Sequence, residues 1–134
     1  MTMPLSRFQP VLLSILRMIA AFVFLAHGTQ KLFAYPSNGS THRVAIMSLL
    51  GAAGVVETIG GSLMLLGLFA RPAAFVLSGE MAVAYFTQHA PLGVWYWPIL
   101  NGGDLAVLFS FLWLFFCAAG PGPISLDGLR GRAK

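Results

Sequence analysis

The chain has 134 residues, of which 57% are hydrophobic and only 9% are charged, and its mean hydropathy is +0.81. About a quarter of the residues in a soluble globular domain are charged, so this composition excludes an ordinary soluble domain. The formal net charge is +4, but the basic residues lie at the ends of apolar stretches. This placement is typical of contact with a membrane surface and does not indicate nucleic-acid binding.

Four apolar stretches of about 20 residues follow one another, and a stretch of this length predicts a membrane-spanning helix. They cover about residues 11–33, 44–69, 72–90 and 101–119. They fill most of the chain and predict a single all-α membrane domain over residues 1–134, an antiparallel bundle of four transmembrane helices. The first stretch is too long for a signal peptide and contains Arg17, so we expect it to be retained. The short turn at Ala70-Arg71-Pro72 makes the second and third helices antiparallel neighbours.

The distribution of basic residues predicts the orientation of the chain. An even number of crossings places both termini and the turn at residues 70–72 on one side, and the opposite side carries only Lys31 and Arg43. The basic residues on the side of the termini are Arg7, Arg71, Arg130, Arg132 and Lys134. Their excess predicts a multi-pass protein of a bacterial cytoplasmic membrane with both termini in the cytoplasm.

Three ionisable residues interrupt the apolar stretches: Arg17, Glu57 and Glu80. Each costs about 2.5–3.5 kcal/mol at membrane depth unless it has a partner or a function. Arg17 and Glu80 lie at comparable depths and are the most favourable ion pair, with Glu57 as the alternative partner. One arginine cannot fully neutralise two carboxylates, so one acid is left to serve a proton relay or a quinone pocket. A purely structural ion pair is the competing interpretation.

Small residues surround Glu57, and Gly54, Glu57 and Gly61 share one face of the predicted helix. Small residues allow helices to approach closely in lipid, so this face predicts a tight helix contact.

A second set of polar residues gathers at the outer ends of the helices. Its members are His27, Gln30, Lys31, Gln88, His89, Asn101 and Asp104. Asn101 followed three residues later by Asp104 is typical of a helix N-cap with an acid in the first turn.

A metal site built from His27, His89 and Asp104 is a weak hypothesis, since no His-x-x-x-His spacing supports it, and we predict no metal site. Glu80 and His89 are nine residues apart and lie on opposite faces of a regular helix. His89 therefore faces the interior only if the helix unwinds before Pro91.

Trp95, Tyr96 and Trp97 follow the third predicted helix. Such a cluster is typical of an interfacial aromatic belt, and a stacking platform for a flat ligand is the alternative. The single cysteine, Cys117, excludes an internal disulfide or CxxC pair, and we expect it to act as a small apolar residue.

The order of motifs resembles the DoxX family over nearly the whole chain. The segments are LRMIAAFVFLAHGTQKLF at residues 16–33, GVVETIGGSLMLLGLFARPAA at 54–74, EMAVAYFTQHAPLGVWYWPILNGGD at 80–104 and GPGPISLD at 120–127. The resemblance implies a small four-helix protein of the bacterial cytoplasmic membrane, related to the small subunit of thiosulfate:quinone oxidoreductase. It further implies a component of an oxidoreductase system. Asp104 stands where many relatives have Glu. Because the chain has only one cysteine, Cys117, the resemblance does not imply dithiol exchange here.

These observations lead to one functional hypothesis and two alternatives. The first is a membrane subunit of a redox system with a polar pocket that opens to the outer face and holds a quinone or a sulfur compound. His27, Glu57 and His89 would exchange protons, and Lys31 would attract an anionic group. Gln30, Gln88, Asn101, Asp104, Trp95 and Trp97 would complete the ligand site. The chain has no motif for haem, flavin or an iron–sulfur cluster, so electrons would come from the bound ligand or from a redox partner protein. The alternatives are a small transporter of protons or weak acids and a noncatalytic assembly module. A homo-oligomer is compatible with each.

Overall fold

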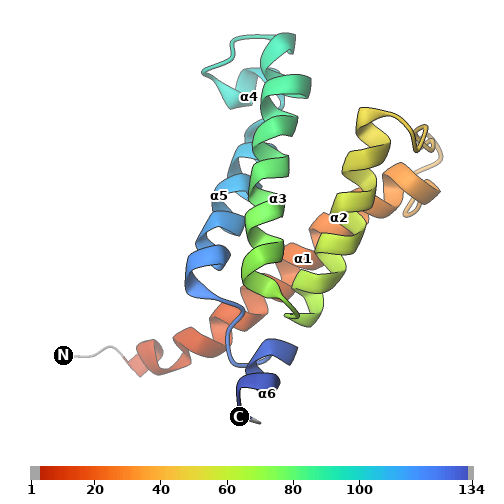
Figure 1. Cartoon of the computed structure of the whole chain (residues 1–134). Helices are drawn as coiled ribbons and strands as arrows, with labels where there is room; N and C mark the ends of the chain where they lie inside the picture. Colours follow the sequence, from red (N-terminus) through yellow and green to blue (C-terminus); the bar gives the residue numbers. More distant parts are fainter. Residues whose placement is uncertain (1–3, 133–134) are drawn as a thin grey trace.

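The computed structural model describes residues 4–132, and within this range the chain forms helices and loops without a β-strand. Four longer helices, α1, α2, α3 and α5, dominate the molecule (Figure 1). The elements are the 3₁₀ turn Pro4–Phe8, α1 (Gln9–Phe33), α2 (Leu49–Leu66), α3 (Ala70–Ala84), the π-helical turn Tyr85–His89, the 3₁₀ turn Ala90–Leu92, α4 (Pro98–Asn101), α5 (Asp104–Ala119) and α6 (Leu126–Arg132). The predicted all-α class is confirmed.

Two helical stretches are long and apolar enough, by length and composition, to cross a membrane: Pro4–Phe33, with 30 residues, and Leu49–Leu66, with 18. The apolar helix α5 is shorter, with 16 residues. Lys134, one of the basic residues used to predict the orientation, lies outside the described residues.

Two predicted helix starts are wrong, and local capping explains both. α2 begins at Leu49 rather than near residue 44, because the Ser48 hydroxyl accepts a hydrogen bond from Gly51 N at 3.0 Å and caps the helix there. Asn101 does not cap the last long helix. It ends the short α4, and α5 begins three residues later, after Gly103.

The helices associate as two close pairs, and glycine makes the first pair, α1 with α2, possible. A Cβ atom at Gly28 would lie only 2.6 Å from the Thr58 hydroxyl, and one at Gly61 would lie 3.1 Å from the Leu25 backbone. The tight contact predicted for the face of Gly54, Glu57 and Gly61 is therefore confirmed.

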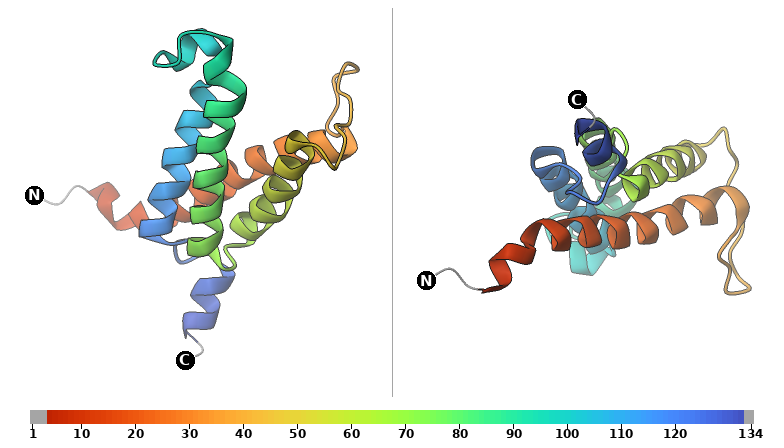
Figure 2. Two further views of the ribbon diagram at one scale, coloured as in Figure 1. Left: turned by 45° about the horizontal axis from the view of Figure 1, so that its top comes forward. Right: turned by 90° about the horizontal axis from the view of Figure 1, so that it is seen from below.

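The second pair, α3 with α5, is joined by reciprocal hydrogen bonds. The Ser78 hydroxyl donates to the Ser110 carbonyl at 2.7 Å, and the Ser110 hydroxyl donates to the Ser78 carbonyl at 2.9 Å. α2 and α3 are neighbours, as the short turn between them predicted: Gly60 of α2 leaves room for the Leu77 side chain of α3. Figure 2 shows that α1 runs along one side of the other helices.

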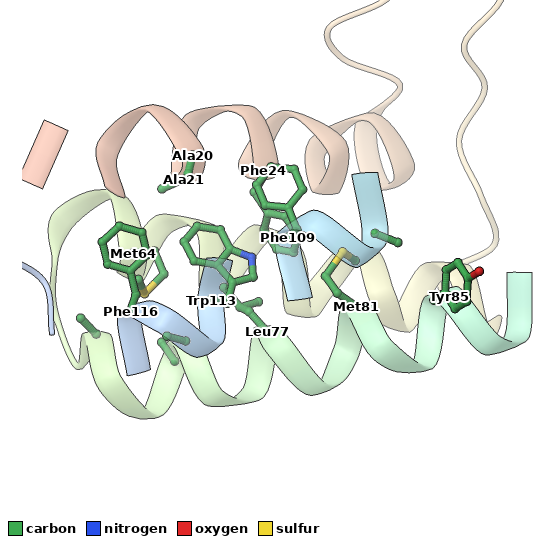
Figure 3. Close-up of a cluster of buried hydrophobic side chains, with 14 residues drawn as sticks. Ala20, Ala21, Phe24, Met64, Leu77, Met81, Tyr85, Phe109, Trp113 and Phe116 are labelled. Atoms are coloured by element: carbon green, nitrogen blue, oxygen red, sulfur yellow. The ribbon is translucent and has the colours of Figure 1, made fainter. Parts of the chain in front are cut away.

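The two pairs meet in an aromatic core. Phe24 of α1 contacts Phe109 and Trp113 of α5, with ring centroids 5.2 and 5.4 Å apart. Figure 3 shows these rings between the helices, with Phe116 and Met64 further along the same cluster. Phe24, Trp113 and Phe116 are almost completely buried, so this cluster, together with the contact of α2 with α3, fixes one pair against the other.

The C-terminal segment packs back onto the bundle after residue 120. The Gly-Pro-Gly-Pro run at residues 120–123 predicts the end of the helix and a short basic tail that leaves the bundle, and the structure corrects this expectation. The Arg17 guanidinium donates to the carbonyls of Pro121 and Ile124, the latter at 2.8 Å. The Asp127 carboxylate accepts from Phe69 N at 3.0 Å and Ala70 N at 2.9 Å, at the start of α3. Residues 120–127 thus fasten together the ends of α1, α2, α3 and α5, which we call the terminal end of the molecule.

We expect Asp127→Ala to destabilise the protein by about 1–2 kcal/mol, because it removes a carboxylate that caps two N–H groups at the positive end of α3. Thermal unfolding in one detergent measures this loss as a lower Tm. Asp104→Ala is the matched control, since the exposed Asp104 makes no side-chain hydrogen bond within residues 4–132. Equal Tm values for the two variants would contradict the capping role.

Candidate functional site

A cavity of about 550 Å³ lies between the two helix pairs, in the half of the molecule away from the terminal end. Residues of α1, α2, α3, the π-turn and α5 line it, and most of them are apolar. Phe24, Met81, Ala106 and Phe109 are among the buried residues of its wall and belong to the core cluster. The polar residues that line it are His27, Lys31, Glu57, Glu80, Thr87, Gln88 and His89. Cavities of this size and composition are typical of sites for small lipophilic molecules with a polar group.

Lys31 and Glu57 form an ion pair on one wall of this cavity. Lys31 Nζ lies 2.5 and 2.6 Å from the two carboxylate oxygens of Glu57. The Glu57 side chain is only 2% exposed, whereas the Lys31 side chain is 26% exposed. Gly54 makes the pairing possible, because a Cβ atom there would lie 3.0 Å from Lys31 Cβ. The ion pair satisfies the buried Glu57 carboxylate, for which the sequence analysis had considered only Arg17 as a partner.

Glu80 has no such partner. Both of its carboxyl oxygens are buried, and neither has a hydrogen-bond partner in the described chain. The side chain lines the cavity from α3, within electrostatic reach of Glu57 and Lys31. A buried charge without a compensating interaction is costly, so Glu80 is the group in this site that most needs a proton or a bound molecule.

His27 lines the cavity from α1. Its Nδ1 lies 2.9 Å from the Val23 carbonyl, one turn earlier in the helix. A carbonyl oxygen only accepts hydrogen bonds, so Nδ1 carries the hydrogen and Nε2 remains available. The imidazole is therefore held in one orientation by its own helix, with its second nitrogen unused among the described residues.

The π-helical turn Tyr85–His89 brings His89 to the same cavity as Glu80. A regular helix would place them on opposite faces, but Ala90 N bonds to the Tyr85 carbonyl five residues earlier, which changes the register. The unwinding that the sequence required for an inward His89 thus occurs as a π-turn. Gln88 also lines the cavity from this turn.

Tyr85 and Asn101 hold this turn in place. The Tyr85 hydroxyl donates to the Trp95 carbonyl, and Asn101 Nδ2 donates to the Tyr85 hydroxyl at 3.0 Å. Asn101 is therefore a buried structural residue beneath the loop and not a helix cap. The sequence analysis missed Tyr85, which lies 10 residues before Trp95 and 16 before Asn101, a spacing that matches no recognisable motif.

The predicted Arg17–Glu80 ion pair is wrong. Arg17 lies at the terminal end, where its guanidinium donates to the carbonyls of Pro121 and Ile124. Those carbonyls belong to a segment without regular helix, whose free acceptors attract the arginine. Matching the depths of two charges along their helices could not reveal that this segment folds back onto α1.

Four other candidate residues lie outside the cavity lining. Asp104 is exposed at the start of α5, and Gln30 donates to the Pro36 carbonyl at 3.0 Å. Trp95 and Trp97 are 62% and 57% exposed, which fits an interfacial belt better than a platform inside the pocket. Within residues 4–132, no group of three or more His, Cys, Asp and Glu side chains is placed to hold a metal ion.

We expect Lys31→Met to cost about 3–5 kcal/mol, because it leaves the Glu57 carboxylate buried without its partner. Unfolding in detergent, followed by circular dichroism, measures the loss. The double variant Lys31→Met with Glu57→Met removes both charges and should recover most of it. A double variant no more stable than the single variant would argue against the ion pair.

Comparisons with known proteins agree on one family. The DoxX family model matches residues 12–90. An uncharacterised protein of Haemophilus influenzae is 44% identical over 125 residues, covering 92% of this chain and 93% of its own. The uncharacterised membrane protein Rv3486 of Mycobacterium tuberculosis is 34% identical over 128 residues, covering 84% of this chain and 77% of its own. No solved structure matches the chain. The family match over most of the chain and the two full-length relatives show that this chain belongs to the DoxX family of membrane proteins.

Proposed function

We propose that the chain is one integral membrane domain over residues 1–134, with four crossings by α1, α2, α3 and α5 and both termini in the cytoplasm. α3 has 15 residues and the π-turn that continues it has 5. Together they are long enough for about 30 Å, the thickness of the hydrocarbon core. Basic residues at the terminal end, Arg71 and Arg130 among them, support the cytoplasmic placement.

We further propose that the domain is the membrane subunit of a redox system and holds a quinone-type molecule in its cavity. The observation that carries this proposal is the pair of buried, unpartnered Glu80 oxygens in an otherwise largely apolar cavity. An apolar cavity suits the ring and tail of a lipophilic ligand, and a few polar groups orient its head. His27 and His89 line the same space and are suited to exchange protons with that head.

The charge balance of the cavity favours a neutral ligand over an anionic sulfur compound. Among the described residues that line the cavity, Lys31 is the only Lys or Arg, and Glu57 neutralises it. With Glu80 also present, the lining offers no unpaired lysine or arginine to an anion. A quinone carries no charge, so its burial in this cavity leaves no unpaired ion. In this scheme, electrons come from the ligand or from a partner protein.

The alternative of a transporter for protons or weak acids rests on the same Glu80. The core cluster argues against it, because Phe24, Phe109 and Trp113 are 1%, 6% and 0% exposed and close the path from the cavity to the terminal end. The alternative of a noncatalytic assembly module calls for a closed interior in which every charge is paired. The 550 Å³ cavity and the unpartnered Glu80 argue against that alternative.

Native mass spectrometry of the protein released from nanodiscs with a short-chain quinone tests the proposal. We expect one bound quinone per chain, and at least about a tenfold loss of affinity in Ala53→Phe, because a large ring placed in the cavity wall competes for the ligand's space. Val76→Phe is the matched control, since Val76 lines a separate apolar groove between α2 and α3. Equal binding by both variants and the unmodified protein would place any bound quinone elsewhere and contradict the proposal.

A flux assay separates the transport alternative. In proteoliposomes with a pH-sensitive dye inside, we expect the unmodified protein and Glu80→Gln to show the same proton flux, at the level of empty vesicles. A flux that depends on Glu80 and needs no quinone would favour the transporter instead.

A further inference from the structure

The polar groups that α1 and α3 contribute to the cavity differ in kind from those on the π-turn. Glu80 contributes two carboxyl oxygens with no donor directed at them from the described residues. His27 contributes Nε2, and its Nδ1 hydrogen is already given to the Val23 carbonyl. In a neutral imidazole with the hydrogen on Nδ1, Nε2 is an acceptor. With Glu80 ionised, the unused hydrogen-bonding capacity of these two groups therefore consists of acceptors.

The neighbouring donors are engaged elsewhere. Lys31 directs its ammonium group to both oxygens of Glu57, at 2.5 and 2.6 Å. The Thr87 hydroxyl donates to the Val83 carbonyl at 2.8 Å. The Gln88 amide reaches only the Thr87 hydroxyl, at 3.5 Å, and it lies on the π-turn near the loops. The donors without a strong partner, the Gln88 amide and the ring N–H of His89, thus both belong to the π-turn.

We propose that the cavity selects a lipophilic molecule whose head donates hydrogen bonds, a quinol or a related phenol, over the corresponding quinone, with Glu80 and His27 Nε2 as the acceptors. This inference rests on the proposed quinone-type site and specifies which form of the ligand it holds. A quinol hydroxyl supplies the donor that Glu80 lacks. A quinone carbonyl only accepts, so it leaves an ionised Glu80 and His27 Nε2 unsatisfied, whereas a quinol hydroxyl donates to such acceptors.

The size of the preference for the quinol depends on the polar groups that a bound quinone leaves without a hydrogen-bond partner. A ligand that leaves a buried polar group of the protein without a hydrogen-bond partner weakens the complex by the full desolvation cost of that group. This cost exceeds the net contribution of an ordinary hydrogen bond, which water can replace. Sites built to bond a ligand hydroxyl therefore reject the analogue that lacks it. We expect the quinol to bind at least about tenfold more tightly than the quinone, since a hydrogen bond to a charged group is lost in the exchange.

Three ligands of nearly the same shape test the inference in nanodiscs under anaerobic conditions: a short-chain quinol, its quinone and the dimethyl ether of the quinol. Calorimetric titration gives a Kd for each. The dimethyl ether keeps the ring and both oxygens but has no donor, so it should bind as weakly as the quinone. Asp104→Asn, which changes an exposed carboxylate outside the cavity, should leave the order of the three affinities unchanged.

The Glu80→Gln variant tests whether the Glu80 carboxylate causes the preference for the quinol. An amide donates as well as accepts, so this variant should bind the quinone at least as well as the quinol. His27→Phe gives a second, independent reading, since it removes the other acceptor and should reduce the quinol preference several-fold. Both variants are first checked for an unchanged Tm, and the three-ligand comparison on the unmodified protein decides the inference if either fails to fold.

The outcomes are distinguishable. A tenfold or greater preference for the quinol that disappears in Glu80→Gln supports the inference. Equal binding of quinol and quinone, or tighter binding of the quinone, overturns it and leaves the proposed quinone site standing. If none of the three ligands binds, both the inference and the proposed function are wrong.

Discussion

The ion pair between Lys31 and Glu57 is the interaction on which the rest of the structure depends. A carboxylate buried among apolar helices is tolerated when it is paired, and here the pairing requires α1 and α2 to lie nearly in backbone contact. Gly28, Gly54 and Gly61 provide that contact. Because Lys31 is thereby committed to Glu57, the second buried acid, Glu80, is left without a basic partner. The polarity of the cavity is thus a consequence of how the first helix pair associates.

The two helix pairs are fixed at one end and separated at the other. Residues 120–127 join the helix ends through Arg17, Asp127 and backbone groups, and the aromatic core lies next to this junction. Further along, the small residue Gly60 meets Leu77, and beyond that contact the space between the pairs becomes the cavity. The packing therefore places rigid structure on the side of the termini and a ligand-sized space toward the loops.

The sequence predicted the parts of the fold that follow from apolar length, small residues and short turns. The helical class, the adjacency of α2 and α3 and the close face around Glu57 were all readable in this way. It did not predict the partner of Arg17, because backbone carbonyls in a segment of irregular structure leave no charge signal. It also could not place His89, since a π-turn depends on the Tyr85 and Asn101 hydrogen bonds that form only in the folded loop. Of the site residues predicted, His27, Lys31, Glu57, Glu80, Gln88 and His89 line one cavity, and their chemical roles remain predictions.

We infer above all that the hydrogen-bonding partner of the Glu80 carboxyl group is a molecule that enters the cavity and not another side chain of the protein. A density map of the protein in nanodiscs made from its native membrane tests this most directly. The account predicts elongated density between the α1–α2 and α3–α5 pairs, with a polar head within hydrogen-bonding distance of a Glu80 carboxyl oxygen. A map in which Arg17 or another side chain of the chain pairs with Glu80, and side chains fill the cavity, would contradict it.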